Sequence, residues 1–287
     1  MALHVADVLD FLRALPADSV DLLVTSPPYE LARTYGLKNM VGGQAWVDWM
    51  VEVVRAASQA VKGLIAIVCE GQTRGYRYSC APFLLMADLH RAGFNLRKPC
   101  VFKRDGIPGS GGPDWLNNRW EPIICVTRPR RLQWSNNIAC GHKPIHRAGG
   151  EVSYRLLDGT RVSGKRMMNL TTSGSKNGDT TYRKKRSPIP DVANPGNIID
   201  CGAVGGGRMG HATAHRNEAP FPLAIPEFFI RSFCLPAGTV CDPFLGSGTT
   251  AHAAKKWGRL FIGCDVRESQ VELTKRRLLT VPTELFV

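Results

Sequence analysis

Residues 239 to 250 read Thr-Val-Cys-Asp-Pro-Phe-Leu-Gly-Ser-Gly-Thr-Thr, and they predict a turn from a buried strand into a helix. The stretch 239–241 is short and favours a β-strand, and Gly246 and Gly248 predict a tight loop. The alanine-rich stretch that follows can begin a helix. A second apolar strand is predicted at 260–264, directly before Asp265. A strand, a glycine loop, a helix and a strand with a terminal acid make up the unit with which α/β proteins bind nucleosides.

The unit differs from two related phosphate-binding loops. The dinucleotide fingerprint has a third glycine, and Ala251 stands where it would fall. No Gly-Lys-Ser/Thr sequence follows, which disfavours a P-loop. The glycines let the backbone approach a ligand closely, and the carboxylate after the second strand can reach ribose hydroxyls.

A second motif, Thr-Ser-Pro-Pro-Tyr at 25–29, directly follows the apolar run 20–24, and a strand is predicted at 20–25. Two consecutive prolines remove two backbone donors and keep the turn out of the helical region. The hydroxyl of Ser26, the carbonyl of Pro27 and the ring of Tyr29 then share one small site. This set suits a planar ligand with an amino group, such as a nucleobase, and the alternative is a proline turn with a core tyrosine.

Together the two motifs resemble those of the DNA amino-methyltransferases. That family carries Asp/Ser/Asn-Pro-Pro-Tyr/Phe as its catalytic motif and Asp-Pro-Phe-x-Gly-x-Gly-Thr as its S-adenosylmethionine motif. Because the catalytic motif comes first here, the chain resembles the circularly permuted β-type members. The resemblance covers roughly 1–127 and 215–287. It implies catalytic residues Ser26, Pro27, Pro28 and Tyr29, and cofactor-binding residues Asp7, Phe221, Asp242, Phe244, Gly246, Ser247, Gly248, Thr249 and Asp265.

The resemblance implies transfer of a methyl group from S-adenosylmethionine to an exocyclic amine of a base flipped out of duplex DNA. Serine at position 26 points, within the family, to N4 of cytosine, and N6 of adenine is the alternative. A catalytically inactive DNA-binding relative and methylation of RNA or protein are the other readings. Permuted relatives often dimerise, so a homodimer is compatible with the resemblance, as is a cognate restriction endonuclease.

The composition fits a globular protein of 287 residues, with 44% hydrophobic residues. No apolar run approaches the length of a membrane span, and no signal peptide is apparent. The nine cysteines include no Cys-x-x-Cys pair, which favours reduced thiols in a cytosolic setting. The resemblance implies that this setting is the cytoplasm of a prokaryotic or phage-infected cell. No metal site is expected, because Cys140, His142 and His146 lack a fourth ligand.

The net charge of +13 is concentrated in one part of the chain. Residues 128–216 hold 16 Lys and Arg against 5 Asp and Glu, which is +11 and leaves only +2 for the remainder. A local basic excess predicts a surface that faces a polyanion, here duplex DNA, although a solvated basic loop is the alternative. The expected DNA contacts are Arg128, Arg130, Arg131, Lys165, Arg166, Arg183, Lys184, Lys185 and Arg186.

The predicted fold class is α/β, a Rossmann-like and mostly parallel sheet with helices on both faces. Residues 1–127 and 215–287 form the catalytic domain, and 128–214 form an inserted, partly β target-recognition region. An amphipathic helix is predicted at 44–62, with Gly63 ending it. Helices are also expected at 7–15, 82–92, 227–235 and 268–279, and further strands at 64–69, 94–103 and 121–127.

Overall fold

The computed structural model describes residues 1–31, 42–104, 113–145, 152–155, 159–164, 167–170, 183–186, 190–201 and 222–282. The chain divides into two compact units, of which the larger comprises Met1–Asn136 with Gly196–Val287 and the smaller comprises Asn137–Pro195. No helix in these described ranges is both long and apolar enough to cross a membrane.

The larger unit contains a nine-stranded sheet in the order β1-β15-β14-β2-β3-β8-β7-β13, with β6 also pairing with β8. Every neighbouring pair is parallel except those that β8 makes with β3, β6 and β7. The sheet is therefore mostly parallel, as predicted. Its strands are β1 (Ala2–Val5), β2 (Val20–Thr25), β3 (Val61–Val68), β6 (Asn95–Leu96), β7 (Cys100–Lys103), β8 (Trp120–Thr127), β13 (Ile198–Asp200), β14 (Thr239–Asp242) and β15 (Leu260–Asp265).

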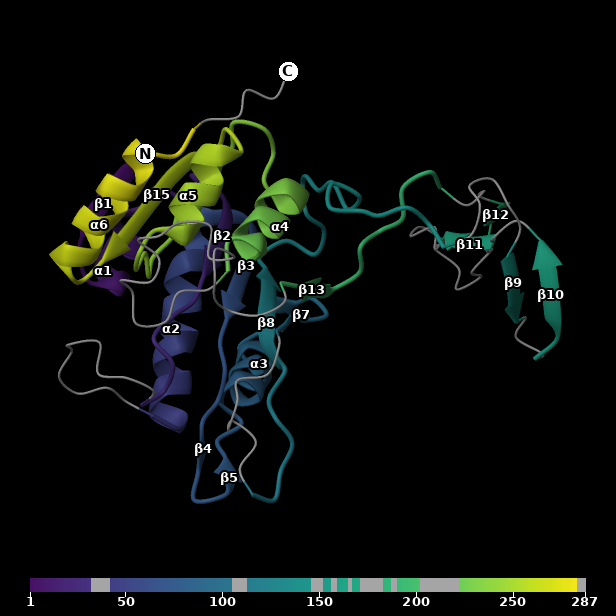
Figure 1. Ribbon diagram of the computed structural model, residues 1–287, viewed down its shortest axis with the longest axis horizontal. Coiled ribbons are helices and arrows are strands. Elements are labelled where there is room, and N and C mark those ends of the chain that lie inside the picture. Colours follow the sequence, from purple (N-terminus) through teal and green to yellow (C-terminus); the bar gives the residue numbers. More distant parts are fainter. Residues whose placement is uncertain are drawn as a thin grey trace. The chain divides into compact units, whose positions relative to one another are not determined.

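Helices cover both faces of the sheet. Successive residues of a strand point to opposite faces, and because the buried strands are apolar at successive positions, both faces need to be covered. In β2, Leu23 packs in one apolar cluster with α1 (Val8–Ala14), α2 (Gln44–Ala60) and α3 (Ala81–Arg91). Its neighbours Leu22 and Val24 pack in the other, with α4 (Ala224–Phe233), α5 (Thr249–Lys256) and α6 (Glu268–Leu279). The two layers of helices are visible in Figure 1.

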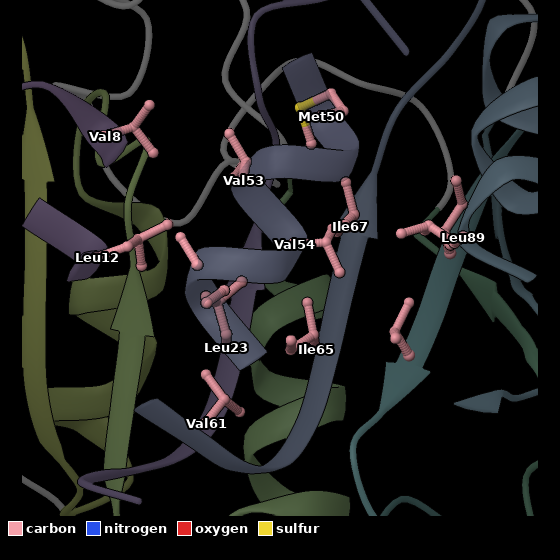
Figure 2. Packing of buried hydrophobic residues seen from close by; sticks show 14 of the residues in the cluster. Val8, Leu12, Leu23, Met50, Val53, Val54, Val61, Ile65, Ile67 and Leu89 are labelled. Atoms are coloured by element: carbon pink, nitrogen blue, oxygen red, sulfur yellow. The ribbon is translucent and has the colours of Figure 1, made fainter. Parts of the chain in front are cut away.

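The first cluster is centred on α2, which lies across β2 and β3 (Figure 2). Met50, Val53 and Val54 are almost fully buried on this helix, at the spacing that the predicted amphipathic stripe requires. Figure 2 shows Met50 toward one end of the drawn part of α2, and Leu23 and Ile65 of the sheet toward the other end.

The prediction that Gly63 ends this helix is wrong. The helix stops at Ala60, and Gly63 lies inside β3, which begins at Val61. A Cβ at Gly63 would lie 1.8 Å from the carbonyl oxygen of Asp21, so the glycine permits a close approach of two strands. The pairing of β2 with β3 shifts register at this point.

One strand prediction also needs correction, and two strand regions were missed. The predicted strand 94–103 is broken into β6 and β7, which both pair with β8, and the break contains Pro99, which lacks an N–H to continue the ladder. The edge strand β1 was not predicted, because most of its side chains are exposed and it carries no apolar run. A short hairpin, β4 (Thr73–Arg74) with β5 (Arg77–Tyr78), was also missed.

The smaller unit contains two antiparallel pairs, β9 (Val152–Arg155) with β10 (Arg161–Gly164), and β11 (Met167–Leu170) with β12 (Arg183–Arg186). The smaller unit, Asn137–Pro195, comprises fewer residues than the predicted insertion 128–214. Asn136 bonds through its backbone N–H to the Ser232 carbonyl of α4, and β13 joins the main sheet beside β7. Residues 128–136 and 196–201 therefore belong to the larger unit.

Candidate active site

The two sequence motifs meet at the carboxyl edge of the sheet. The hydroxyl of Thr25, the last residue of β2, donates a 2.6 Å hydrogen bond to Oδ1 of Asp242, the last residue of β14. From β2 the chain continues through α2 to β3 on one side, and from β14 it continues through α5 to β15 on the other. Adjacent parallel strands whose connections diverge in this way form the position at which open α/β sheets bind ligands.

The Ser-Pro-Pro-Tyr turn is held from two sides. Trp46 of α2 donates from Nε1 to the Pro28 carbonyl at 2.9 Å, and the Tyr29 hydroxyl donates to Oε2 of Glu121 at 2.7 Å. Ser26 is partly exposed, while Pro27 is buried. The Pro27 carbonyl accepts no hydrogen bond from the residues that the structure describes, so an acceptor beside the Ser26 hydroxyl is available to a ligand.

Tyr29 belongs to a buried polar network that includes Glu121 and Arg104. Arg104 Nη1 lies 2.7 Å from Oε1 of Glu121, so the two carboxylate oxygens are bonded to a cation and a phenol. Burial raises the pKa of Glu121, and the charge of Arg104 and the Tyr29 hydrogen bond oppose that rise. Burial and then Glu121 raise the pKa of Tyr29, whereas a hydrogen bond with Ser26 lowers it. The tyrosine is therefore a neutral phenol whose ring is fixed beside Ser26.

The glycine loop has the backbone that its sequence requires. Gly246 and Gly248 have φ values of 49° and 77°, in the left-handed region that favours glycine. A Cβ at Gly248 would lie 2.5 Å from Oγ1 of Thr274 on α6. The loop is thus packed tightly against α6, and Gly248 caps the start of α5.

Three carboxylates gather near this loop, at or after the ends of three strands. Burial raises the pKa of the Cys264 thiol, and so do Asp242, Asp265 and Asp7, which all lie near it. Asp265 accepts from the Gly246 N–H at 2.9 Å and from the Arg267 N–H at 2.9 Å. Asp7 is exposed and caps α1 by accepting from the Leu9 N–H at 2.8 Å. Negative charge is therefore concentrated where the resemblance places the cofactor.

Asp242 is the most buried of the three, with 1% exposure. Burial raises its pKa to about 6, although hydrogen bonds from Thr25, Thr250 and the Phe244 N–H favour the carboxylate. Its observed contacts join the two motifs to each other. Phe244 is partly exposed and packs its ring edge-on to Trp49, with 5.6 Å between centroids.

A buried arginine on α6 forms hydrogen bonds to the glycine loop. Arg277 of α6 is fully buried and donates to the Ser247 carbonyl at 3.0 Å and to Thr249 Oγ1 at 3.1 Å. Its Nε also donates to Nδ1 of His252 at 3.2 Å. Burial lowers the pKa of Arg277 to about 10, which leaves it a cation at neutral pH.

The predicted DNA contacts are distributed differently. Arg128 follows β8 and lies at the opposite edge of the sheet from Ser26, where it forms an ion pair with Asp18. The carbonyls of Arg128 and Arg130 accept from Asn95 and Arg97. The structure does not bring Arg128, Arg130 and Arg131 to the catalytic turn. Arg183, Lys184, Lys185 and Arg186 form β12, while Phe221, Lys165 and Arg166 lie outside the described residues.

Sequence reasoning missed Thr25, Glu121, Arg104 and Arg277. A carboxylate at the start of the apolar run 121–127 was a visible signal, because a buried acid needs a partner. The partners themselves are distant in sequence and carry no local signature.

The model of the N6 and N4 methyltransferase family, described as DNA methylase, matches residues 20–276. The chain belongs to this family. Methyl transfer in the family uses S-adenosylmethionine, so the predicted family and cofactor are confirmed.

Two relatives of the methylase span nearly its whole length. The type II methyltransferase M.ScaI of Streptomyces caespitosus is 27% identical over 301 residues, covering 99% of this chain and 83% of its own. The DNA adenine methyltransferase YhdJ of Escherichia coli strain K12 is 25% identical over 275 residues, covering 95% and 80%.

Solved structures confirm the predicted fold class. The PvuII DNA methyltransferase (cytosine-N4-specific) matches with a TM-score of 0.67 at 17% identity, covering 99% of this chain and 87% of its own. TTHA0409 of Thermus thermophilus, solved in complex with S-adenosyl-L-methionine, matches with a TM-score of 0.59 at 21% identity, covering 98% and 94%. At these identities the likeness establishes the fold.

Proposed function

We propose that this methylase transfers a methyl group to the exocyclic amine of a base extruded from duplex DNA, and that the amine is N4 of cytosine. The observation that supports the reaction is the Thr25–Asp242 hydrogen bond, because it holds the catalytic turn directly beside the glycine loop. Ser26 follows Thr25, so its hydroxyl lies at the same edge of the sheet as Phe244 and Gly246.

Ser26 and Pro27 supply the two acceptors that the reaction needs. The lone pair of an exocyclic amine is delocalised into the ring, which makes the amine a poor nucleophile. Hydrogen bonds from its two N–H groups to Ser26 Oγ and the Pro27 carbonyl would pull the nitrogen toward a tetrahedral shape. Its lone pair then projects out of the ring plane, and positioning together with fixed dipoles accounts for much of the acceleration.

Tyr29 stabilises the extruded base. Flipping a base out of a duplex costs a few kcal/mol. Stacking on an aromatic ring is typically worth about 1–3 kcal/mol per base, which is enough to offset that cost. The bond from Tyr29 to Glu121 fixes the ring before the base arrives. Binding of the base therefore does not cost the conformational entropy of ordering this side chain.

The residues of the loop fit S-adenosylmethionine. Its sulfonium supplies an electrophilic methyl group, and a cation is favoured beside Asp7, Asp242 and Asp265. Phe244 offers a partly exposed ring, and the glycines allow close approach of the backbone. We assign adenosine contacts to Asp7, Asp265, Phe244 and the loop Gly246, Ser247, Gly248 and Thr249, with Asp242 holding the loop in place.

The choice of cytosine rests on Ser26. A neutral hydroxyl suffices for the more polarised amine of cytosine, and the structural neighbour from PvuII is cytosine-N4-specific. The relative YhdJ is named as an adenine enzyme, which makes N6 of adenine the second candidate. Duplex DNA as substrate places the protein in the compartment that holds the DNA, which is the cytoplasm in bacteria such as those of the relatives.

The test is to express the chain in a host that lacks other DNA amino-methylation and to digest its plasmid DNA for mass spectrometry. We expect N4-methylcytosine among the nucleosides of the digest. N6-methyladenine alone would overturn the choice of base, and the absence of both would overturn the reaction. Purified protein offered RNA, single strands and duplex DNA in competition should prefer the duplex.

Replacing Ser26 by alanine tests the site. We expect kcat to fall by about 10²-fold or more, as for removal of one oxyanion-hole donor. The matched control is Ser58→Ala, since Ser58 lies near the far end of α2 and its hydroxyl bonds to the Arg55 carbonyl of the same helix. Unchanged activity in Ser26→Ala would show that the acceptor is misassigned, and an inactive but DNA-binding wild type would indicate a non-catalytic relative.

A further inference from the structure

The β4–β5 hairpin, which extends from the sheet in Figure 1, plays no part in the reaction described above. It follows the carboxyl end of β3 and is therefore at the same edge of the sheet as the catalytic turn. Its two-residue turn is Gly75-Tyr76, and the φ values are 53° and 63°, as a type I′ turn requires.

Tyr76 is an unusual residue for this turn. Type I′ turns favour asparagine, aspartate and glycine, and a bulky side chain at positive φ is strained. The side chain of Tyr76 is 78% exposed, so no burial within the chain compensates for that strain. Strained residues of this kind concentrate at functional sites, where their position is useful.

A second segment, residues 113–120, is attached to the base of the hairpin. Glu70 accepts from Asn118 Nδ2 at 2.9 Å and from the Tyr78 hydroxyl at 2.6 Å, which joins this segment to β5. Trp115 and Leu116 are each 79% exposed. Residues 72–79 and 113–120 together are called the hairpin surface below.

The hairpin surface is connected to the catalytic turn. Glu30, which follows Tyr29, accepts from the Gln72 N–H at 3.3 Å, and Arg74 donates from Nη2 to the Leu31 carbonyl at 2.8 Å. A duplex that delivers a base to Ser26 must lie over this edge of the sheet. The hairpin surface is thus placed where the DNA on one side of the extruded base would run.

Its chemistry suits DNA. Arg77 and Arg119 are exposed, and in the described part of the chain no carboxylate lies within ion-pair distance of either. Exposed aromatic rings interleaved with arginines form the combination that stacks on bases and contacts phosphates.

We propose that the hairpin surface is a DNA-binding site separate from the basic smaller unit. Arg77 and Arg119 contact phosphates, and Tyr76 at the tip packs against the bases beside the extruded one. The site rests on the proposed function, because it takes duplex DNA as its ligand.

The test uses Tyr76→Asn and Arg77→Gln in the full chain. Asparagine tolerates positive φ, so Tyr76→Asn relieves strain, and its melting temperature should equal or exceed that of the wild type. Its kcat/KM for plasmid DNA should nevertheless fall about tenfold or more, the usual effect of losing one stacked ring. Arg77→Gln should reduce the slope of log Kd against log salt, measured with a fluorescein-labelled duplex, by about one.

Matched controls are Leu279→Ala, which removes a side chain that is 85% exposed, and Arg13→Gln, which removes an exposed arginine at the end of α1. Both lie toward the opposite edge of the sheet and should behave as the wild type does. Affinity for S-adenosylmethionine should be unchanged in all four variants.

Wild-type kinetics and salt dependence in Tyr76→Asn and Arg77→Gln would overturn the site while leaving the proposed function intact. A wild type that neither binds nor methylates duplex DNA would instead overturn the proposed function. Variants that bind DNA normally but lose self-association in gel filtration would identify a second copy of the chain as the occupant, and would also overturn the site.

Discussion

The Thr25 hydroxyl and the Asp242 carboxylate are 217 residues apart in sequence and 2.6 Å apart in space. Both groups are buried, at 2% and 1% exposure, at the ends of two adjacent strands. A hydrogen bond to a buried charged group typically contributes about 1.5–3 kcal/mol. This contact therefore fixes the distance between the catalytic turn and the cofactor loop.

Replacing Thr25 by valine keeps the shape of the side chain and removes the hydroxyl. We expect the free energy of unfolding, from urea titration, to fall by about 1.5–3 kcal/mol, and the methylation rate to fall with it. Thr127→Val is the matched control, since the Thr127 hydroxyl is also buried and bonds to the Asn95 carbonyl at the far edge of the sheet. That variant should lose stability but retain kcat; equal kinetic effects in the two variants would contradict a specific role for Thr25.

The raised pKa of Asp242 makes the free energy of unfolding depend on pH. Burial lifts the pKa from its ordinary 3.8 to about 6 in the folded chain. Between these values the folded state binds a proton that the unfolded state has released. The contribution to stability is therefore present below pH about 4 and is lost as the pH rises through about 6.

Asp242→Asn removes this titration while keeping an oxygen for Thr25. The difference in unfolding free energy between the wild type and Asp242→Asn should fall by roughly 2–3 kcal/mol from pH about 4 to pH about 7. Urea titrations without cofactor at a series of pH values measure it. A difference that stays constant over this range would mean that Asp242 titrates normally.

The features that could be predicted from sequence are those with a local signature. Strand β2 and helix α6 have the predicted bounds, because an apolar run and an amphipathic stripe are bounded by clear breaks. Both motifs were assigned to one site only through resemblance. The contacts of Thr25 and Glu121 depend on which strands become neighbours, and no property of either residue's own segment specifies that.

Gly63 illustrates the same limit and gives a test. A glycine after an apolar stripe is a common helix end, yet here it allows β3 to approach Asp21. Gly63→Ala should destabilise the chain by several kcal/mol or prevent folding, because backbone would have to move. Gly93→Ala is the control: its φ is +84° and a Cβ there would meet nothing within 4 Å, so we expect a loss of about 1 kcal/mol. Similar losses in both variants would show that the strand pairing at Gly63 is wrong.

The bond between Tyr29 and Glu121 is tested by a double-mutant cycle. Tyr29→Phe removes the donor and keeps the ring, and Glu121→Gln removes the charge and keeps an acceptor. If Glu121 acts by orienting the ring, both variants should raise KM for DNA and reduce base extrusion, and the double variant should be no worse than the more impaired single variant.

Base extrusion is measured from the fluorescence of 2-aminopurine placed at the target position. Glu121→Gln should in addition lose about 3 kcal/mol or more of stability, because it leaves the charge of Arg104 unpaired and only 15% exposed. Tyr29→Phe leaves that ion pair intact and should lose less, so it separates ring orientation from folding. Additive effects on KM in the cycle would show that the two residues act independently, and that the network serves stability rather than the reaction.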